Sequence, residues 1–287
     1  VQIEAVKNST WRGAEAKAEA QAKLGALKIE IGTPLRDLAY TVQPMGRGSF
    51  GGNMLIASTW RHREEMKRIG KGNADRRWDV LPQQPSLAYD LAQNRLIVTA
   101  AILQGPVFNV KADAADKFGS FGGLVGHELN RAVDAKGALV DAKGELRSWW
   151  TPADKTAWTL LGNRVAAQYG AYEFPGVKGA KVNGTLTQEE NLADIAGLEL
   201  AWAAYTAQEP KAKPAQQQGF FRAWAALWPQ QLSPNEAARR LTADIRAPGR
   251  WRTNGPLSNL PAFGATFSCK AGQPMQRTDA EQIKVWR

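Results

Sequence analysis

The chain has 287 residues, of which 44% are hydrophobic and 22% are charged, a composition typical of a globular protein with a substantial core and not of a disordered chain. The net charge is +10, but lysine and arginine are spread among acidic residues over the whole length and form no basic run interleaved with aromatics. We therefore expect no nucleic-acid partner. No continuous apolar stretch reaches the about 20 residues that a transmembrane helix needs.

The first predicted element is an amphipathic helix over residues 10–31, which is rich in Ala, Glu and Lys and ends at Gly32. A glycine-rich connection at residues 46–52 follows, and we place a domain boundary near residue 50. A second helix is expected over residues 53–70. The apolar, β-branched run at residues 94–103 predicts a strand of a small sheet.

The remainder is predicted to be mostly helical. A helix over residues 119–133 begins through glycines, and a long helix over residues 187–205 has Thr187 at its N-cap and Glu190 completing a capping box. Two shorter helices are expected at residues 218–228 and 234–245. The tail, residues 248–287, is expected to be rich in loops.

A candidate metal motif lies in the glycine-rich helix, at "HELNR", His127 to Arg131. His-Glu-x-x-His on a helix presents two imidazoles on one face, and the Glu between them can polarise a metal-bound water. Here Arg131 occupies the place of the second histidine. Alone, a His-Glu pair is a weak signal, and His127 could equally be a hydrogen-bonded core residue.

A second motif, further along the chain, supports the interpretation of His127 to Arg131 as a metal motif. The stretch "EENLADIAGLELAWAAY", residues 189–205, resembles the second active-site helix of the neprilysin and endothelin-converting-enzyme family of zinc metallopeptidases. The resemblance implies that Glu190 corresponds to the third zinc ligand and Asp194 to the residue that orients His127. Ala196 departs from the family pattern, which has glycine there. Read as isolated residues, Glu190 and Asp194 fit structural ion pairs better than catalytic roles.

The resemblance continues in collinear order through "LAYDLAQNRLIVTAAILQGPVF", "FFRAWAALW", "IRAPGRWRTNGPLSNLPAFGATFSC" and the final "VWR". It implies a mainly α fold with a small β-sheet, namely the thermolysin-like catalytic lobe of that family without its N-terminal portion. Residues 1–50 would be the end of the smaller helical domain and residues 51–287 the lobe. Because the sequence begins at Val1 and not at Met, we expect a mature product or a fragment.

Family members are more than twice this length, which implies a missing segment. We therefore expect an exposed apolar surface that is covered by the N-terminal half of the same precursor or by a separately encoded partner chain. Alanine- and arginine-rich usage and the resemblance to exported relatives favour a bacterial, extracytoplasmic protein of the periplasm.

Several positions that the family uses for chemistry differ here. The resemblance implies that Ser86 replaces an asparagine that binds the substrate backbone, and that Arg246 replaces the histidine that stabilises the tetrahedral intermediate. It implies that Arg252 is retained as the substrate-binding arginine. Cys269, the only cysteine, has lost its usual disulfide partner. Arg246 and Arg252 could be plain surface arginines, or could line a cleft that accepts an anionic group or a C-terminal carboxylate.

Of these differences, Arg131 in place of a histidine has the largest effect on metal binding. A guanidinium stays protonated and offers no lone pair, so His127 and Glu190 alone cannot complete a site with three protein ligands. We expect its side chain to take the metal position and to contact Glu190 or the vestigial base Glu128. The predicted protein is a zinc-free pseudopeptidase that binds a peptide or protein, or acts as a structural subunit. The alternatives are an active peptidase with an atypical zinc site and an enzyme repurposed for other acid/base chemistry.

Overall fold

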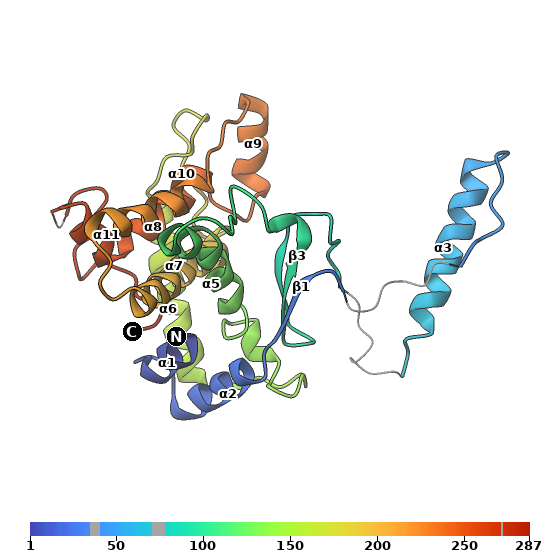
Figure 1. Ribbon diagram of the computed structural model, residues 1–287, viewed down its shortest axis with the longest axis horizontal. Helices are drawn as coiled ribbons and strands as arrows, with labels where there is room; N and C mark the ends of the chain where they lie inside the picture. The colour runs from blue at the N-terminus through green and yellow to red at the C-terminus, as the bar shows by residue number, and fades with distance from the viewer. Residues whose placement is uncertain (35–40, 71–77, 271) are drawn as a thin grey trace.

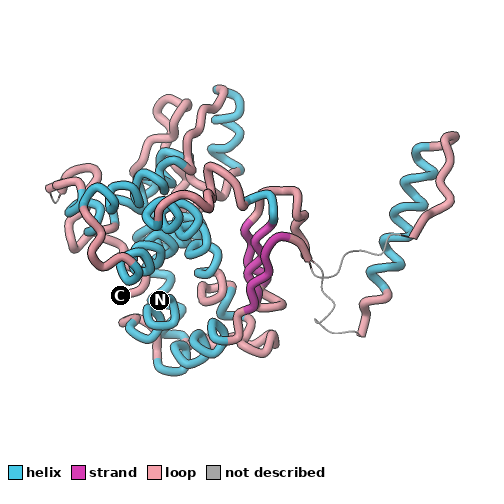
Figure 2. Tube along the Cα trace, viewed as in Figure 1, coloured by secondary structure: helices cyan, strands magenta, loops and turns pink. Residues whose placement is uncertain are grey.

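The computed structural model describes residues 1–34, 41–70, 78–270 and 272–287. Helices form most of the body, and a small sheet lies at one side of it (Figures 1 and 2). The helices are α1 (Gln2–Asn8), α2 (Ala14–Gly25), α3 (Phe50–Met66), α4 (Ala114–Lys117), α5 (Gly123–Asn130), α6 (Pro152–Gly170), α7 (Gln188–Gln208), α8 (Pro214–Ala226), α9 (Pro234–Ala243), α10 (Gly249–Asn259) and α11 (Pro261–Thr266). The expected mainly α architecture is confirmed.

The sheet has the strand order β1-β3-β2, with β1 (Lys28–Gly32) parallel and β2 (Leu87–Asp90) antiparallel to β3 (Arg95–Thr99). The predicted strand is thus present, but it is shorter than expected. The single helix predicted over residues 10–31 is wrong, because α2 ends at Gly25 and the chain then enters β1. Charged and apolar residues alternate from Lys28 to Ile31 with the period of a strand, and pairing with β3 decides the conformation.

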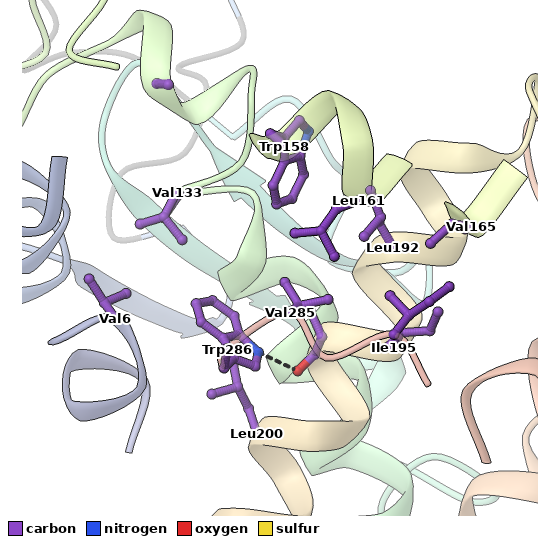
Figure 3. Packing of buried hydrophobic residues seen from close by; sticks show 14 of the residues in the cluster. Val6, Val133, Trp158, Leu161, Val165, Leu192, Ile195, Leu200, Val285 and Trp286 are labelled. Atoms are coloured by element: carbon purple, nitrogen blue, oxygen red, sulfur yellow. Dashed lines mark hydrogen bonds between the residues drawn. The ribbon is translucent and has the colours of Figure 1, made fainter. Parts of the chain in front are cut away.

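The main core surrounds α7. Trp158, Leu161 and Val165 of α6 lie across from Leu192 and Ile195 of α7 (Figure 3). The C-terminal tail closes the other side of this core, where the buried indole of Trp286 donates a 2.9 Å hydrogen bond from Nε1 to the Ala196 carbonyl oxygen. Large aromatic side chains therefore serve packing between helices.

Helices α5 and α7 touch through their backbones. A Cβ atom placed on Gly126 would lie 2.5 Å from the carbonyl oxygen of Gly197, and one on Gly197 would lie 2.3 Å from the backbone nitrogen of His127. Only glycine permits this approach. The helix that carries the histidine and the helix that carries Glu190 are consequently in direct backbone contact.

Two further helix predictions need correction. The predicted helix at residues 119–133 begins earlier, at α4, and passes through a π-helical turn (Phe118–Gly122) before α5. The tail predicted as loop-rich contains α10 and α11. Glycines and Pro256 inside α10 obscure the helical pattern, and burial of Gly255 and Leu257 in the body stabilises it.

Helix α3 stands away from the body (Figure 1) and has no buried residue. Residues 35–40 and 71–77, which flank its segment, lie outside the described residues. Strand β1 precedes the predicted boundary near residue 50 and pairs with β3 beyond it; the boundary itself stays a prediction. Among the described residues, no helix combines the length and apolar character needed to cross a membrane.

Candidate functional site

Two helices provide the residues of the candidate site. His127 lies in the last turn of α5, and Arg131 caps that helix with helical backbone angles, φ −63° and ψ −21°. Residues four apart on a helix share a face, so the two side chains point the same way. Across the glycine contact, α7 presents Glu190 and Asp194, again four residues apart. The structure thus brings together the four residues that the two sequence motifs predict.

His127 is fixed by Asp194. Its Nδ1 lies 2.7 Å from Asp194 Oδ1, and both side chains are buried. Burial opposes the charged imidazolium, but the hydrogen bond to Asp194 and the nearby carboxylates of Glu190 and Glu128 outweigh it and raise the pKa of His127 to about 9. The orienting role that the resemblance implies for Asp194 has the geometry it requires.

Glu190 is surrounded by positive charge. Its Oε1 accepts a hydrogen bond from Arg131 Nη2, and its Oε2 lies 3.2 Å from Nε of Arg246. His127 Nε2 is 3.6 Å from the same Oε2 atom. Burial raises the pKa of this carboxyl, but the nearby imidazole of His127 and the charges of Arg131 and Arg246 together lower it well below its usual range. Glu190 is therefore ionised at any physiological pH.

Arg252 completes the support of Asp194. Its Nε and Nη2 atoms each donate a 2.7 Å hydrogen bond to one oxygen of the Asp194 carboxylate. Its guanidinium also lies 3.7 Å from the ring centroid of Trp228, a favourable cation-π geometry. Burial raises the pKa of Asp194, but the charge and hydrogen bonds of Arg252 outweigh it and lower that pKa. Arg252 is thus a buried partner of the site and not a plain surface arginine.

Glu128 sits on the sheet side of the cluster. Its Oε2 accepts a 3.2 Å hydrogen bond from the backbone nitrogen of Tyr89 in β2 and lies 3.7 Å from Nε of Arg131. The carboxylate that would serve as a base is therefore tied to both the sheet and a guanidinium. The Tyr89 contact could not be found from sequence, because it depends on how α5 packs against β2.

Ser86 lies apart from this cluster. Its backbone nitrogen donates to Thr99 Oγ1 and its carbonyl accepts from the Thr99 nitrogen, which pairs the start of β2 with the end of β3. Within the described residues its hydroxyl makes no hydrogen bond to the cluster. The role of Ser86 in substrate binding stays a prediction.

The predicted capping box at the start of α7 is wrong. Thr187 is at the N-cap, but its hydroxyl donates to the Asn183 carbonyl and accepts from Asn191 Nδ2. Glu190 cannot also reach back to the cap, because its carboxylate is held in the cluster by Arg131 and Arg246. Cys269 is a free thiol.

The residues present do not fit a catalytic zinc ion. Arg131 Nη2 is 3.3 Å from His127 Nε2 and hydrogen bonds Glu190 Oε1, so the guanidinium lies between the two atoms that would ligate the metal. It offers no lone pair and carries a fixed positive charge. Over the described residues, no three His, Cys, Asp or Glu side chains gather so as to hold a metal ion.

The fold and the paired motifs define the class: a metallopeptidase-like lobe in which Arg131 contacts both His127 and Glu190. Residues 88–283 match the model of Peptidase family M13. The chain belongs to this family.

Relatives confirm the family and show how much of it is present. The chain is 28% identical to an endothelin-converting enzyme homolog of Locusta migratoria, covering 98% of this chain and 40% of the relative. It is 26% identical to Neprilysin-3 of Drosophila melanogaster, with coverage of 98% and 37%. The chain therefore spans less than half the length of these relatives.

Solved structures agree. The Mycobacterium tuberculosis zinc metalloprotease Zmp1, crystallised with an inhibitor, superposes with a TM-score of 0.90 at 28% identity, over 99% of this chain and 45% of that one. PepO of Lactobacillus rhamnosis superposes with a TM-score of 0.82 at the same identity and coverage. The expected correspondence to the C-terminal part of larger family members is confirmed.

Proposed function

We propose that this chain is a zinc-free pseudopeptidase of family M13 that binds peptide or protein without hydrolysing it. The observation that supports this proposal is the position of Arg131 Nη2 between His127 Nε2 and Glu190 Oε1. Without a metal there is no Lewis acid to polarise a peptide carbonyl and no agent that lowers the pKa of water to about 7.

The acidic residues remain because they now belong to an ion-pair network. Glu190 is balanced by Arg131 and Arg246, and Asp194 by His127 and Arg252. Buried carboxylates are tolerated when they are paired and hydrogen bonded. The network holds these side chains in place without a metal ion, which supports a binding role that does not depend on hydrolysis.

We also propose that the chain assembles with the N-terminal half of its precursor or with a partner chain. Large apolar side chains are exposed on β1 and on α3. They are Ile29 61%, Ile31 61%, Phe50 82%, Met54 54% and Leu55 68% exposed. An apolar surface of this kind is typical of an interface, and relatives have more than half of their length outside the matched region. A bacterial periplasmic location remains part of this proposal.

Two measurements on the purified chain test the proposal. Metal analysis after dialysis against zinc should find far less than one zinc per chain, and a quenched-fluorescent peptide should not be cleaved. Cleavage that a chelator abolishes would instead support the alternative of an active peptidase with an atypical site. For assembly, native mass spectrometry of the complex should reveal a companion polypeptide, and a solitary chain would contradict that part.

A further inference from the structure

The most informative unassigned feature is the pair of arginines that share Glu190. Arg131 comes from the end of α5 and Arg246 from the segment before α10, and they bind opposite oxygens of one carboxylate. Because one carboxylate holds both, the two guanidinium groups are fixed a few ångström apart. Such an arrangement positions their remaining N–H groups without help from a ligand.

The outer parts of these guanidinium groups are open. The Arg246 side chain is 51% exposed and approaches Glu190 through Nε, and within the described residues its Nη atoms make no hydrogen bond. The Arg131 side chain is 20% exposed, with Nη2 on Glu190 and Nε near Glu128. Arg252 differs, because it is 12% exposed and both of its donating atoms are used by Asp194. Two cations of the cluster therefore retain donors for a ligand.

Strand β2, which forms one edge of the sheet, leads toward the arginine pair. In an antiparallel pair, successive residues direct their backbone groups alternately to the partner strand and outward. Tyr89 directs its N–H outward to Glu128, so Leu87 faces outward as well. A peptide added along β2 would run beside Glu128 toward the arginine pair, because Glu128 contacts both Tyr89 and Arg131.

From this geometry, and on the basis of the proposed peptide-binding function, we infer that the arginine pair Arg131 and Arg246 recognises the C-terminal carboxylate of a bound peptide. A carboxylate matches the planar donor fork of arginine and forms charge-assisted hydrogen bonds with it. Glu128 weakens the attraction but does not occupy the outer donors of the pair, because its Oε2 is held at Tyr89 N–H and near Arg131 Nε. The ligand would thus end at the arginine pair and not continue past it.

The test compares two pools of fluorescein-labelled random hexapeptides that differ only in the C-terminus, a free carboxylate or a carboxamide. Fluorescence anisotropy with the 287-residue chain should show the acid pool binding about tenfold more tightly, the size expected for losing one charge-assisted interaction. The Arg246→Gln variant should remove the difference. Arg250→Gln is the matched control, because Arg250 is an exposed arginine over Trp251 outside the cluster, and it should keep the preference.

The remaining possible results each contradict either the carboxylate inference or the proposed function. Equal binding of the two pools, or a preference that survives Arg246→Gln, overturns the carboxylate inference and leaves peptide binding intact. Displacement of the acid pool by millimolar acetate or inorganic phosphate would show a general anion site and also overturn it. Absence of binding by both pools overturns the inference and the peptide-binding function together, whereas chelator-sensitive cleavage of the amidated pool overturns the proposed function.

Discussion

The Nη2 atom of Arg131 lies 3.3 Å from Nε2 of His127, the residue one helical turn earlier in the chain. The guanidinium of Arg131 and the imidazole of His127 can lie this close because the carboxylate of Glu190 lies beside both and balances their positive charge. In the proposed zinc-free protein, the side chains of Arg131 and His127 supply the positive charge beside Glu190.

Arg131→His should create a zinc site. Residue 131 keeps helical backbone angles, so the new imidazole lies on the face of His127 and opposite Glu190, which gives three protein ligands. We expect about one zinc per chain by mass spectrometry of the dialysed variant, the stoichiometry of a single site with three protein ligands. Binding should tighten further in Arg131→His with Arg246→His, because the cation beside Glu190 is also removed. Failure of both variants to retain zinc would show that the frame has changed beyond residue 131.

Arg252→Met should destabilise the fold. The substitution leaves Asp194, which is 1% exposed, without the guanidinium that holds both of its oxygens. Removing one partner of a buried ion pair costs about 3 kcal/mol, measurable by urea unfolding. Arg250→Met, a neighbouring exposed arginine, should change the free energy of unfolding by less than about 0.5 kcal/mol. Similar losses in both variants would refute a special role for Arg252.

Gly126→Ala should disrupt the contact between α5 and α7. The added methyl would lie 2.5 Å from the Gly197 carbonyl oxygen, so the helices must separate. We expect a loss of about 1–3 kcal/mol in unfolding free energy, as for an overpacked core. Gly25→Ala is the control, since nothing lies within 4 Å of a Cβ there, and it should be neutral or slightly stabilising. An unaffected Gly126→Ala protein would mean that the helices are not in backbone contact.

Stability should fall between neutral and alkaline pH because of His127. Its pKa is raised to about 9 in the folded chain from about 6.5 in the unfolded chain. Its stabilising contribution is therefore complete below pH about 6.5 and is lost as the pH rises through about 9. The difference in unfolding free energy between the native chain and His127→Gln should shrink over this interval. NMR titration, with the exposed His62 replaced by Gln to leave one histidine, should show the midpoint directly, and a midpoint near 6.5 would contradict the prediction.

The two site helices could be predicted from the sequence. The motifs around His127 and Glu190 indicate a helix in each case and show which residues lie on the face that points to the site. The closeness of Arg131 to Glu190 follows from those motifs. The involvement of Tyr89 and Trp228 does not, because each depends on packing between elements far apart in the chain. The residues of β1 continue an Ala-, Glu- and Lys-rich stretch and are therefore predicted to be helical, but their alternation of charged and apolar residues is the signal that fits the strand paired with β3. Glu190 could not serve the predicted cap once its carboxylate was engaged in the cluster.

The glycine contact between α5 and α7 has an evolutionary consequence. Since backbone against backbone sets the spacing of these helices, the scaffold needs no bound ion to keep its dimensions. Changes at position 131 during evolution can therefore alter what the site binds while the spacing of the two helices stays the same.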